Sequence, residues 1–302
     1  MKAVRFNQYG GIDVLQITDV PIPEPAQGEV LVKVKAASIN PGEAKIRAGL
    51  LHARWPATFP SGEGSDFAGI VAKLGGAAPG LAVNDEVIGF TNRRASHAEY
   101  VVVGAANLTR KPANVSWEVA GSLPIAGSTA YAAVRAVSLK PGDTVAVSGA
   151  AGGVGSIAVQ LARRAGASVS GIAGPGNHDW LMAHGIRPVA YGEGLSDRLR
   201  AARLDALIDT HGGGYVKLAV DLGLAPERIN TIIDFPAVQQ YHVKAEGSQT
   251  ALNVAVLAEL ARLVAASELE VPIAAIFPLA DVRSAFALLE KGHTRGKIVL
   301  LP

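Results

Sequence analysis

Short runs of β-branched and apolar residues, separated by turns that contain glycine or proline, dominate the first third of the chain. Such runs predict strands, and they are Ala3–Phe6, Ile12–Thr18, Glu29–Ser38, Phe67–Lys73, Glu86–Phe90 and His97–Val103. The proline-rich stretch Pro21–Pro25 separates the second run from the third. This pattern is typical of an irregular, mostly antiparallel β domain.

The pattern changes near Trp117. From Thr144 onward, short apolar runs alternate with helical patterns, as expected for β-α-β units around a parallel sheet. Six strands are predicted: Thr144–Ser148, Ser168–Ala173, Pro188–Tyr191, Ala206–Thr210, Ile229–Asp234 and His242–Ala245. Apolar residues at helical spacing after the first strand predict a helix with one apolar face. The number and spacing of these elements match the dinucleotide-binding fold.

The last part of the chain returns to mixed elements. We expect a long helix over Gln249–Ser267, a strand over Ile273–Phe277, a short helix over Ala280–Glu290 and a final strand over Lys297–Leu301. The final strand should rejoin the first domain, because a central domain inserted in a β domain brings both chain ends together. The predicted fold class is α/β: a doubly wound Rossmann sheet of six strands, residues 117–246, inserted in a β-rich domain formed by residues 1–116 and 247–302.

Composition excludes several classes of protein. A chain of 302 residues with 49% hydrophobic content permits one to three domains. The formal net charge is +2 and no long basic run occurs, which disfavours nucleic-acid binding. We expect no membrane span and no secretion signal, because no uncharged apolar stretch is long enough and Met1–Tyr9 lacks the required layout. The absence of cysteine excludes disulfides and thiolate-bound metals, so a soluble cytoplasmic protein is predicted.

The strongest local signal is a glycine-rich turn between the first predicted parallel strand and its helix. Its residues are Gly149, Ala150, Ala151, Gly152, Gly153, Val154 and Gly155. A turn without side chains lets the backbone approach a pyrophosphate, and the N-terminus of the following helix favours the phosphates. The spacing is a variant of G-x-G-x-x-G with an extra residue. The alternative is a turn that only packs helix against strand.

The second predicted parallel strand bears on the choice of dinucleotide. NAD-binding proteins usually end this strand with an acidic residue on the ribose hydroxyls. Here the strand ends in Gly171-Ile-Ala-Gly174, and Asp179 is the first carboxylate after it. Because a carboxylate would repel a 2′-phosphate, its absence favours NADPH over NADH. Further cofactor-binding candidates are Asn177 and His178, which follow the strand, and Tyr191, which ends the next strand; His178 is equally consistent with an ordinary exposed residue at a helix start.

Besides the glycine turn, several further segments of the chain match one known protein family. They are Met1-Lys-Ala-Val-Arg5, Ala36-Ala-Ser-Ile-Asn-Pro-Gly-Glu-Ala-Lys-Ile-Arg-Ala-Gly49, Gly64-Ser-Asp-Phe-Ala-Gly69, Asn84-Asp-Glu-Val-Ile-Gly89, Ala126-Gly-Ser-Thr-Ala-Tyr131 and Gly292-His-Thr-Arg-Gly-Lys-Ile-Val-Leu300. Through these segments the chain resembles, essentially from end to end, the zinc-independent quinone oxidoreductase (zeta-crystallin-like) branch of the medium-chain dehydrogenase/reductase superfamily.

The resemblance implies a GroES-like β-rich catalytic domain, with NADPH in the cleft beside it. It also implies that Asn40 and Thr129 lie near the nicotinamide and the substrate carbonyl. From the C-terminal portion, it places Lys297 and the segment Phe277-Pro-Leu279 near the cofactor, and it makes Tyr191 and His178 contacts of the 2′-phosphate. Homodimers are common in this family. One departure is that the chain has Lys45 and Leu51 where relatives often carry pocket tyrosines, so its substrate range can differ.

A catalytic zinc is not expected. The related alcohol dehydrogenases use cysteine, histidine and a carboxylate, whereas Asn40 stands where their first cysteine would fall. Glu63 alone, with no histidine near it in sequence, does not make a zinc site. Without a Lewis acid, reduction of a conjugated acceptor is easier than reduction of an isolated ketone, because the developing oxyanion is delocalised.

That oxyanion still gains from hydrogen-bond donors. We expect Asn40 and Thr129 to supply them, and water or Lys45 to deliver the proton. The alternatives are a turn residue for Asn40, a helix-start cap for Thr129 and a solvated surface charge for Lys45. His211, beside Gly212-Gly-Gly214, should face the cofactor by topology, although an ordinary loop histidine fits the same pattern.

The predicted function is transfer of hydride from NADPH to a quinone or an α,β-unsaturated carbonyl. A second enzyme class with this fold is an enoyl-thioester reductase, which would need a wider pocket mouth. A third possibility is a nicotinamide-binding protein with little turnover, as in crystallins of this fold. The partners expected are a small-molecule substrate and a second copy of the chain.

Overall fold

The computed structural model describes all 302 residues, and the chain packs as two compact units. Unit 1 consists of Met1–Ile125, Asn253–Glu268 and Ile273–Pro302, and unit 2 consists of Ala126–Leu252 and Leu269–Pro272. Unit 2 is thus inserted in sequence between parts of unit 1. The predicted domain boundaries, after residues 116 and 246, fall nine and six residues before these limits, and Leu269–Pro272, predicted as part of the β-rich domain, packs in unit 2. None of the helices has both the length and the apolar character needed to cross a bilayer.

Unit 1 contains a three-stranded sheet, in the order β2-β1-β4, and a seven-stranded sheet. The larger sheet runs β14-β15-β3-β5-β6-β8, with β7 paired to β3. All its pairings are antiparallel except that of β14 with β15. The strands are β1 (Lys2–Phe6), β2 (Gln16–Asp19), β3 (Glu29–Ser38), β4 (Ser61–Gly62), β5 (Asp66–Leu74), β6 (Glu86–Phe90), β7 (Tyr100–Gly104), β8 (Leu108–Arg110), β14 (Ile273–Pro278) and β15 (Lys297–Leu301).

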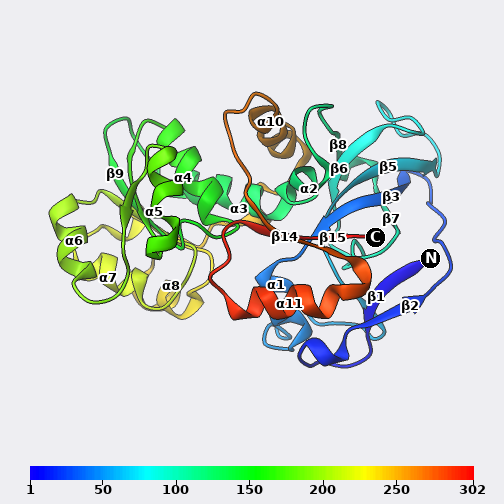
Figure 1. Cartoon of the computed structure of the whole chain (residues 1–302), viewed down its shortest axis with the longest axis horizontal. Helices are drawn as coiled ribbons and strands as arrows, with labels where there is room; N and C mark the ends of the chain where they lie inside the picture. The colour runs from blue at the N-terminus through cyan, green and yellow to red at the C-terminus, as the bar shows by residue number, and fades with distance from the viewer. The chain divides into compact units, whose positions relative to one another are not determined.

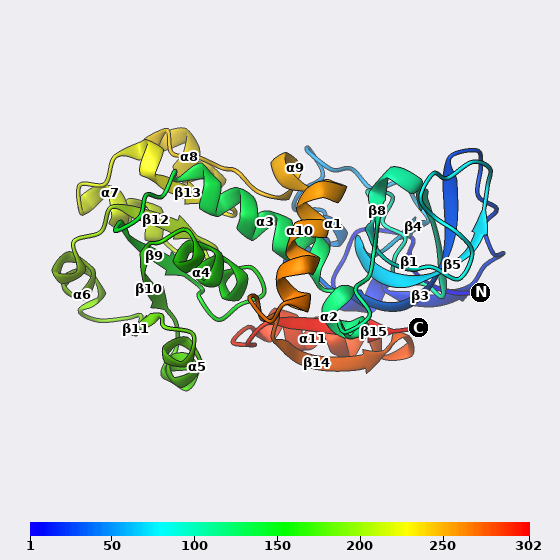
Figure 2. The same ribbon diagram turned by 90° about the horizontal axis from the view of Figure 1, so that it is seen from above.

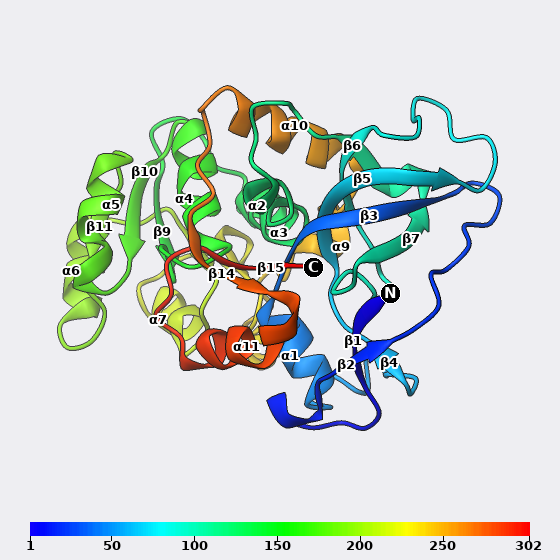
Figure 3. The same cartoon turned by 45° about the vertical axis from the view of Figure 1, so that its right-hand side comes forward.

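The two ends of the chain meet in this larger sheet. Strand β15 pairs with the end of β3, through Val299 opposite Ser38 and Leu300 opposite Ala37. Strand β3 also pairs along its length with β5, and the two run side by side in Figure 3. The expected return of the final strand to the first domain is confirmed. Valines that alternate along β3 and its neighbours form the core of this sheet.

Few helices belong to unit 1. They are α1 (Pro41–Arg47), α2 (Trp117–Ala120), α10 (Val254–Ala265) and α11 (Val282–Lys291). Helix α11 packs on β14 and β15 through a second core cluster that includes Val282 and Phe286. Both chain ends, marked in Figure 1, belong to unit 1.

Unit 2 is built on a parallel five-stranded sheet in the order β11-β10-β9-β12-β13. Its strands are β9 (Thr144–Ser148), β10 (Ser168–Ile172), β11 (Arg187–Val189), β12 (Ala206–Asp209) and β13 (Ile229–Thr231). The order reverses between β9 and β12, as in the Rossmann fold. The predicted doubly wound architecture is therefore confirmed.

The helices of unit 2 connect these strands. They are α3 (Leu123–Ala136, which begins in unit 1), α4 (Gly155–Arg164), α5 (His178–Ala183), α6 (Leu195–Ala202), α7 (Tyr215–Asp221), α8 (Phe235–Tyr241) and α9 (Ser248–Ala251). Helix α4 packs on β9 and β10, whereas α7 packs on β12 and β13, as Figure 2 shows from above. An apolar core cluster joins the sheet to α7 and includes Ala146, Leu207 and Val216.

Three sequence-based predictions of elements were wrong. The predicted strand Ile12–Thr18 is a short 3-10 helix, Ile12–Val14, followed by β2. Arg283 donates to the carbonyl oxygens of Asp13 and Leu15, and these long-range bonds hold the turn.

The predicted sixth parallel strand, His242–Ala245, is reduced to a single bridge between Lys244 and Asn230. Helix α8 occupies the chain up to Tyr241, and His242 leaves it in a left-handed conformation with φ of 55°. Too few extended residues remain to form a strand.

The predicted helix Gln249–Ser267 is two helices, α9 and α10. Asn253 interrupts it because its side-chain oxygen accepts from the N–H of Val256 at 3.0 Å and so starts a new helix.

Candidate functional site

The glycine turn connects β9 to α4 at the carboxyl end of the first parallel strand. Gly149 has φ of 58°, in the left-handed region, and the N–H of Gly152 donates to its carbonyl oxygen at 2.8 Å. A Cβ atom at Gly155 would lie 2.1 Å from that same oxygen. The turn therefore excludes side chains at the positions where the backbone is most tightly folded.

The turn also leaves the start of helix α4 open to a ligand. No side chain caps the helix, and Ser156 is its first residue whose N–H donates to the main chain, to Gly152 at 2.9 Å. N–H groups at the beginning of a helix are good donors to phosphate. The turn lies at the point where the strand order reverses, which is where open α/β sheets bind ligands. These residues fit a dinucleotide diphosphate.

The residues predicted to select the cofactor gather after β10. The hydroxyl oxygen of Tyr191 would lie 3.4 Å from a Cβ atom at Gly174, and the Tyr191 side chain is 49% exposed. The N–H of Asn177 donates to Gly174 at 2.9 Å. His178 is the first residue of α5, as its structural interpretation predicts, but it is half-buried rather than exposed, and its Nε2 lies 3.3 Å from the carbonyl oxygen of Ala173. The structure brings all four residues together.

His211 lies next to the glycine turn. Its Cβ atom would be 3.3 Å from a Cβ atom at Gly149, and its ring contacts Tyr215 edge-on at 6.1 Å between centroids. The structure thus places this histidine beside the glycine turn, and its contact with the cofactor stays a prediction.

Thr129 lies in the middle of helix α3, which begins at Leu123. The alternative interpretation of this residue as a helix-start cap is therefore wrong. The residue is buried, and its methyl group faces Gly247.

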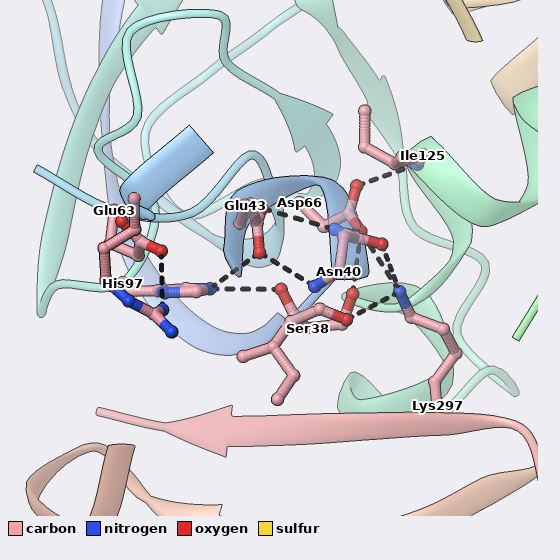
Figure 4. A network of polar contacts seen from close by, with 10 residues as sticks. Ser38, Asn40, Glu43, Glu63, Asp66, His97, Ile125 and Lys297 are labelled. Carbon is pink, nitrogen blue, oxygen red and sulfur yellow. Dashed lines mark hydrogen bonds and ion pairs between the residues drawn. The ribbon is translucent and has the colours of Figure 1, made fainter. Parts of the chain in front are cut away.

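A buried polar network in unit 1 surrounds Asn40 (Figure 4). The Asn40 side-chain NH₂ donates to Asp66 at 2.9 Å and to Glu43 at 3.3 Å, and its oxygen accepts from Lys297 at 2.5 Å. Asp66 accepts further bonds from the Ser38 hydroxyl at 2.7 Å and from the N–H of Ile125 at 2.8 Å. All hydrogen-bonding groups of the Asn40 amide are thus engaged within unit 1.

Lys297 is an interior residue of unit 1, with 4% of its surface exposed. Its ammonium group donates to Asn40 and to the carbonyl oxygen of Ile39 at 3.1 Å, and lies 3.7 Å from Asp66. Burial lowers the pKa of Lys297 and raises that of Asp66, so each charge depends on the other. This internal role differs from the expected position of Lys297 at the cofactor, and its contact with the cofactor stays a prediction.

The other predicted residues of unit 1 occupy different environments. Lys45 is half-buried on α1. Phe277 is half-buried, while Leu279 is 5% exposed and belongs to the core cluster that includes Phe286. Leu279 therefore packs in the interior, and its contact with the cofactor stays a prediction.

A histidine does lie near Glu63, contrary to what the sequence indicated. The backbone N–H of His97 donates to the Glu63 carbonyl oxygen at 3.1 Å, and the Nε2 atom of the His97 ring is 4.0 Å from the Glu43 carboxylate. Burial raises the pKa of Glu63 to about 8 even though Arg47 lies 3.3 Å away, and burial lowers the pKa of His97 to about 4. No group of three or more histidine or acidic side chains is arranged to hold a metal ion.

Sequence reasoning missed three buried carboxylates, Glu43, Asp66 and Asp209. Glu43 accepts the Asn40 backbone N–H at 2.8 Å, and the spacing Asn-x-x-Glu before an apolar helix was a signal for this contact. Asp66 and Asp209 lie in strands, and no local pattern marks their partners.

Two family profiles match the chain. The alcohol dehydrogenase GroES-like domain matches residues 26–139, and a zinc-binding dehydrogenase domain matches residues 193–300. The NADPH-dependent alkenal/one oxidoreductase of Arabidopsis thaliana is 31% identical over the whole chain and 80% of its own length. The 2-methylene-furan-3-one reductase of Solanum lycopersicum is 37% identical, but the match spans 54% of this chain and only 44% of that protein.

Solved structures are similar over the full chain. The quinone oxidoreductase of Coxiella burnetii has a TM-score of 0.91 and 34% identity, covering 100% of this chain and 99% of that one. The Escherichia coli quinone oxidoreductase in complex with NADPH has a TM-score of 0.89 and 26% identity, with complete coverage of both chains. With its GroES-like domain, its Rossmann sheet and these relatives, the chain belongs to the quinone oxidoreductase branch of the medium-chain dehydrogenase/reductase superfamily.

Proposed function

We propose that the protein is an oxidoreductase that uses NADPH to reduce a quinone or an α,β-unsaturated carbonyl compound. The observation that carries this proposal is the glycine turn at the carboxyl end of β9, which precedes an uncapped helix and in which Gly155 lies too close to the backbone of Gly149 to carry a side chain. The names of the Arabidopsis and E. coli relatives support NADPH as cofactor and a conjugated acceptor as substrate.

Unit 2 supplies the groups that bind the cofactor in this proposal. The backbone of Gly149–Gly155 and the first turn of α4 bind the diphosphate. Tyr191, Asn177 and His178 contact the 2′-phosphate, because they lie beside Gly174 and no carboxylate stands there to repel it. When bound, NADPH supplies the hydride.

The expected role of Asn40 as a direct hydrogen-bond donor to the developing oxyanion needs revision. Both N–H groups of its amide already donate to carboxylates, so a direct bond to substrate would require one of them to be released. In this proposal Asn40 therefore acts through the network, and Thr129 keeps the donor role that the family resemblance implies. Water or Lys45 delivers the proton.

Titration of the folded protein with NADPH and with NADH, followed by nicotinamide fluorescence, tests the cofactor assignment. We expect NADPH to bind more tightly. Loss of nicotinamide absorbance with a quinone, a 2-alkenal or an enoyl thioester then separates the substrate classes. Reduction of the thioester alone would favour the enoyl-thioester reductase, and tight binding with no turnover would favour a binding protein.

The remaining predictions belong to the same proposal. We propose catalysis without zinc, because Asn40 stands at the position of a cysteine ligand and the chain has no cysteine. Metal analysis of active protein, and its activity in the presence of a chelator, test this prediction. A cytoplasmic homodimer that does not bind nucleic acid is also proposed, and light scattering measures the oligomeric state.

A further inference from the structure

Asp209 is a completely buried carboxylate at the end of β12. It lies opposite Ser148, the last residue of β9, in the register of the parallel sheet. These two strands are the ones between which the strand order reverses, so Asp209 lies directly behind the proposed cofactor site. The proposed mechanism does not use it.

Four donors surround this carboxylate. Oδ1 accepts from the Ser148 hydroxyl at 2.6 Å, from the N–H of His211 at 3.1 Å and from the N–H of Gly212 at 2.8 Å. Oδ2 accepts from the Thr231 hydroxyl at 2.8 Å.

The direction of the two hydroxyl bonds follows from their other partners. The Ser148 oxygen accepts the N–H of Thr210 at 3.0 Å, and the Thr231 oxygen accepts the N–H groups of Ile233 at 3.2 Å and Asp234 at 3.0 Å. The hydroxyl hydrogens are therefore free to point at Asp209. All four partners can therefore donate to the two oxygens of the Asp209 side chain.

These bonds hold a loop that contains three consecutive glycines. Gly212, Gly213 and Gly214 all have left-handed φ values, of 83°, 74° and 90°. Glycines lose much conformational freedom when they are ordered, so this loop needs an anchor. The bonds from His211 and Gly212 to Asp209 provide one.

The anchored loop forms a wall of the glycine turn. The Thr210 hydroxyl donates to the Ser148 carbonyl oxygen at 2.7 Å. The Thr210 hydroxyl oxygen would lie 3.0 Å, and the Cβ atom of His211 3.3 Å, from a Cβ atom at Gly149. His211 therefore links Asp209 to Gly149, the first glycine of the turn. A shift of the Asp209 side chain would displace this neighbour of the turn.

We propose that Asp209 is a positioning residue for the dinucleotide site: it holds the end of β9 and the loop of residues 210–214 in the one arrangement in which the glycine turn is preformed. This inference rests on the proposed function, since it assumes that the turn binds NADPH. Its consequence is that loss of the charge weakens cofactor binding without contact between Asp209 and the cofactor.

Asp209→Asn tests this role with a side chain of the same shape. Its NH₂ group would face the Thr231 hydroxyl, whose oxygen already accepts two N–H groups, so that a donor meets a donor. We expect the Kd for NADPH to rise at least tenfold and the amides of His211 and Gly212 to exchange faster. A tenfold rise in Kd corresponds to a loss of about 1.4 kcal/mol of binding free energy. At saturating NADPH this loss no longer affects the rate, so kcat should stay within about twofold of wild type.

Asp221→Asn is the matched control, because this exposed carboxylate pairs only with Lys217 on the surface of α7. It should leave the Kd unchanged. A folded Asp209→Asn variant with wild-type affinity would overturn the inference, since a merely structural residue lowers the melting temperature alone. If that variant does not fold, Ser148→Ala removes one of the four donors, and an unchanged Kd there would overturn the inference equally. Failure of the wild-type protein to bind NADPH would instead refute the proposed function.

Discussion

Gly155 tests the fit of the glycine turn at the level of one atom. A methyl group there would meet the backbone oxygen of Gly149, which cannot move without opening the turn. We expect Gly155→Ala to raise the Kd for NADPH by tenfold or more. Gly104→Ala is the control, because a Cβ atom there meets nothing within 4 Å. Equal affinities of the two variants for NADPH would show that the cofactor does not use the turn.

Because of Glu63, the stability of the protein should fall as the pH rises from 4.5 to about 8. The pKa of Glu63 in the folded state, about 8, lies above its ordinary value of 4.5, so the folded protein holds a proton that the unfolded chain releases. The stability from this proton is complete below pH 4.5, falls by about 1.4 kcal/mol per pH unit as the pH rises from 4.5 to about 8, and falls no further above that pH.

Glu63→Gln is neutral at every pH and should abolish this loss, as measured by denaturant unfolding between pH 5 and 9. The control is Glu290→Gln, because Glu290 is the other carboxylate partner of Arg47 and lies 2.9 Å from its guanidinium group. This variant should still lose stability as the pH rises. A wild-type curve that is flat over this range would contradict the prediction.

Part of the candidate site could be predicted residue by residue, and part could not. The spacing of the glycines, and their position between a predicted strand and a predicted helix, indicate the turn, so Gly149 and Gly155 were identified from the sequence. The partners of Asn40 were not, because Asp66 and Lys297 come from distant strands and only the folded sheet joins them. A carboxylate buried in this way leaves no local sequence signal.

At the scale of elements, local pattern succeeded where tertiary contacts agree with it. The predicted bounds of β3, β6, β9 and β15 are those observed, since each is a β-branched run with turn residues at its ends. The pattern failed at Ile12–Thr18, where Arg283 from a distant helix imposes a turn, and at His242–Ala245, where a helix consumes the residues that a strand would need.

The segment Leu269–Pro272 packs in unit 2 although its neighbours in sequence belong to unit 1. Gln160 on α4 bonds both the N–H and the carbonyl oxygen of Glu270, each at 2.9 Å. The Glu270 carboxylate accepts from Trp180 at 3.2 Å and lies 2.8 Å from the Nε2 atom of His184.

We expect Glu270→Ala to accelerate hydrogen exchange of this segment. The variant loses the contacts of the carboxylate with Trp180 on α5 and with His184 just after α5, while the main-chain bonds of Glu270 to Gln160 remain. The neighbouring Glu268→Ala, whose carboxylate lies 3.7 Å from Arg262 on α10, is the control. If both variants exchange at the wild-type rate, the side chain of Glu270 does not hold the segment.

At the scale of the whole molecule, the last strand completes the first domain. Lys297→Met would leave Asp66 buried without its cation, and removal of one member of a buried ion pair costs about 3–5 kcal/mol. Urea unfolding should show this loss. The exposed Lys291→Met should show none, and the double variant Lys297→Met with Asp66→Asn should recover part of it. Wild-type stability of Lys297→Met would contradict the assigned role.

The pairing of β15 with β3 has a consequence for biosynthesis. During translation the strands β1 to β8 leave the ribosome before the inserted unit, yet their sheet lacks a member until β15 has been made. The inserted α/β unit, by contrast, has all five of its strands available long before release. Vectorial synthesis therefore favours maturation of the middle of this polypeptide before its beginning.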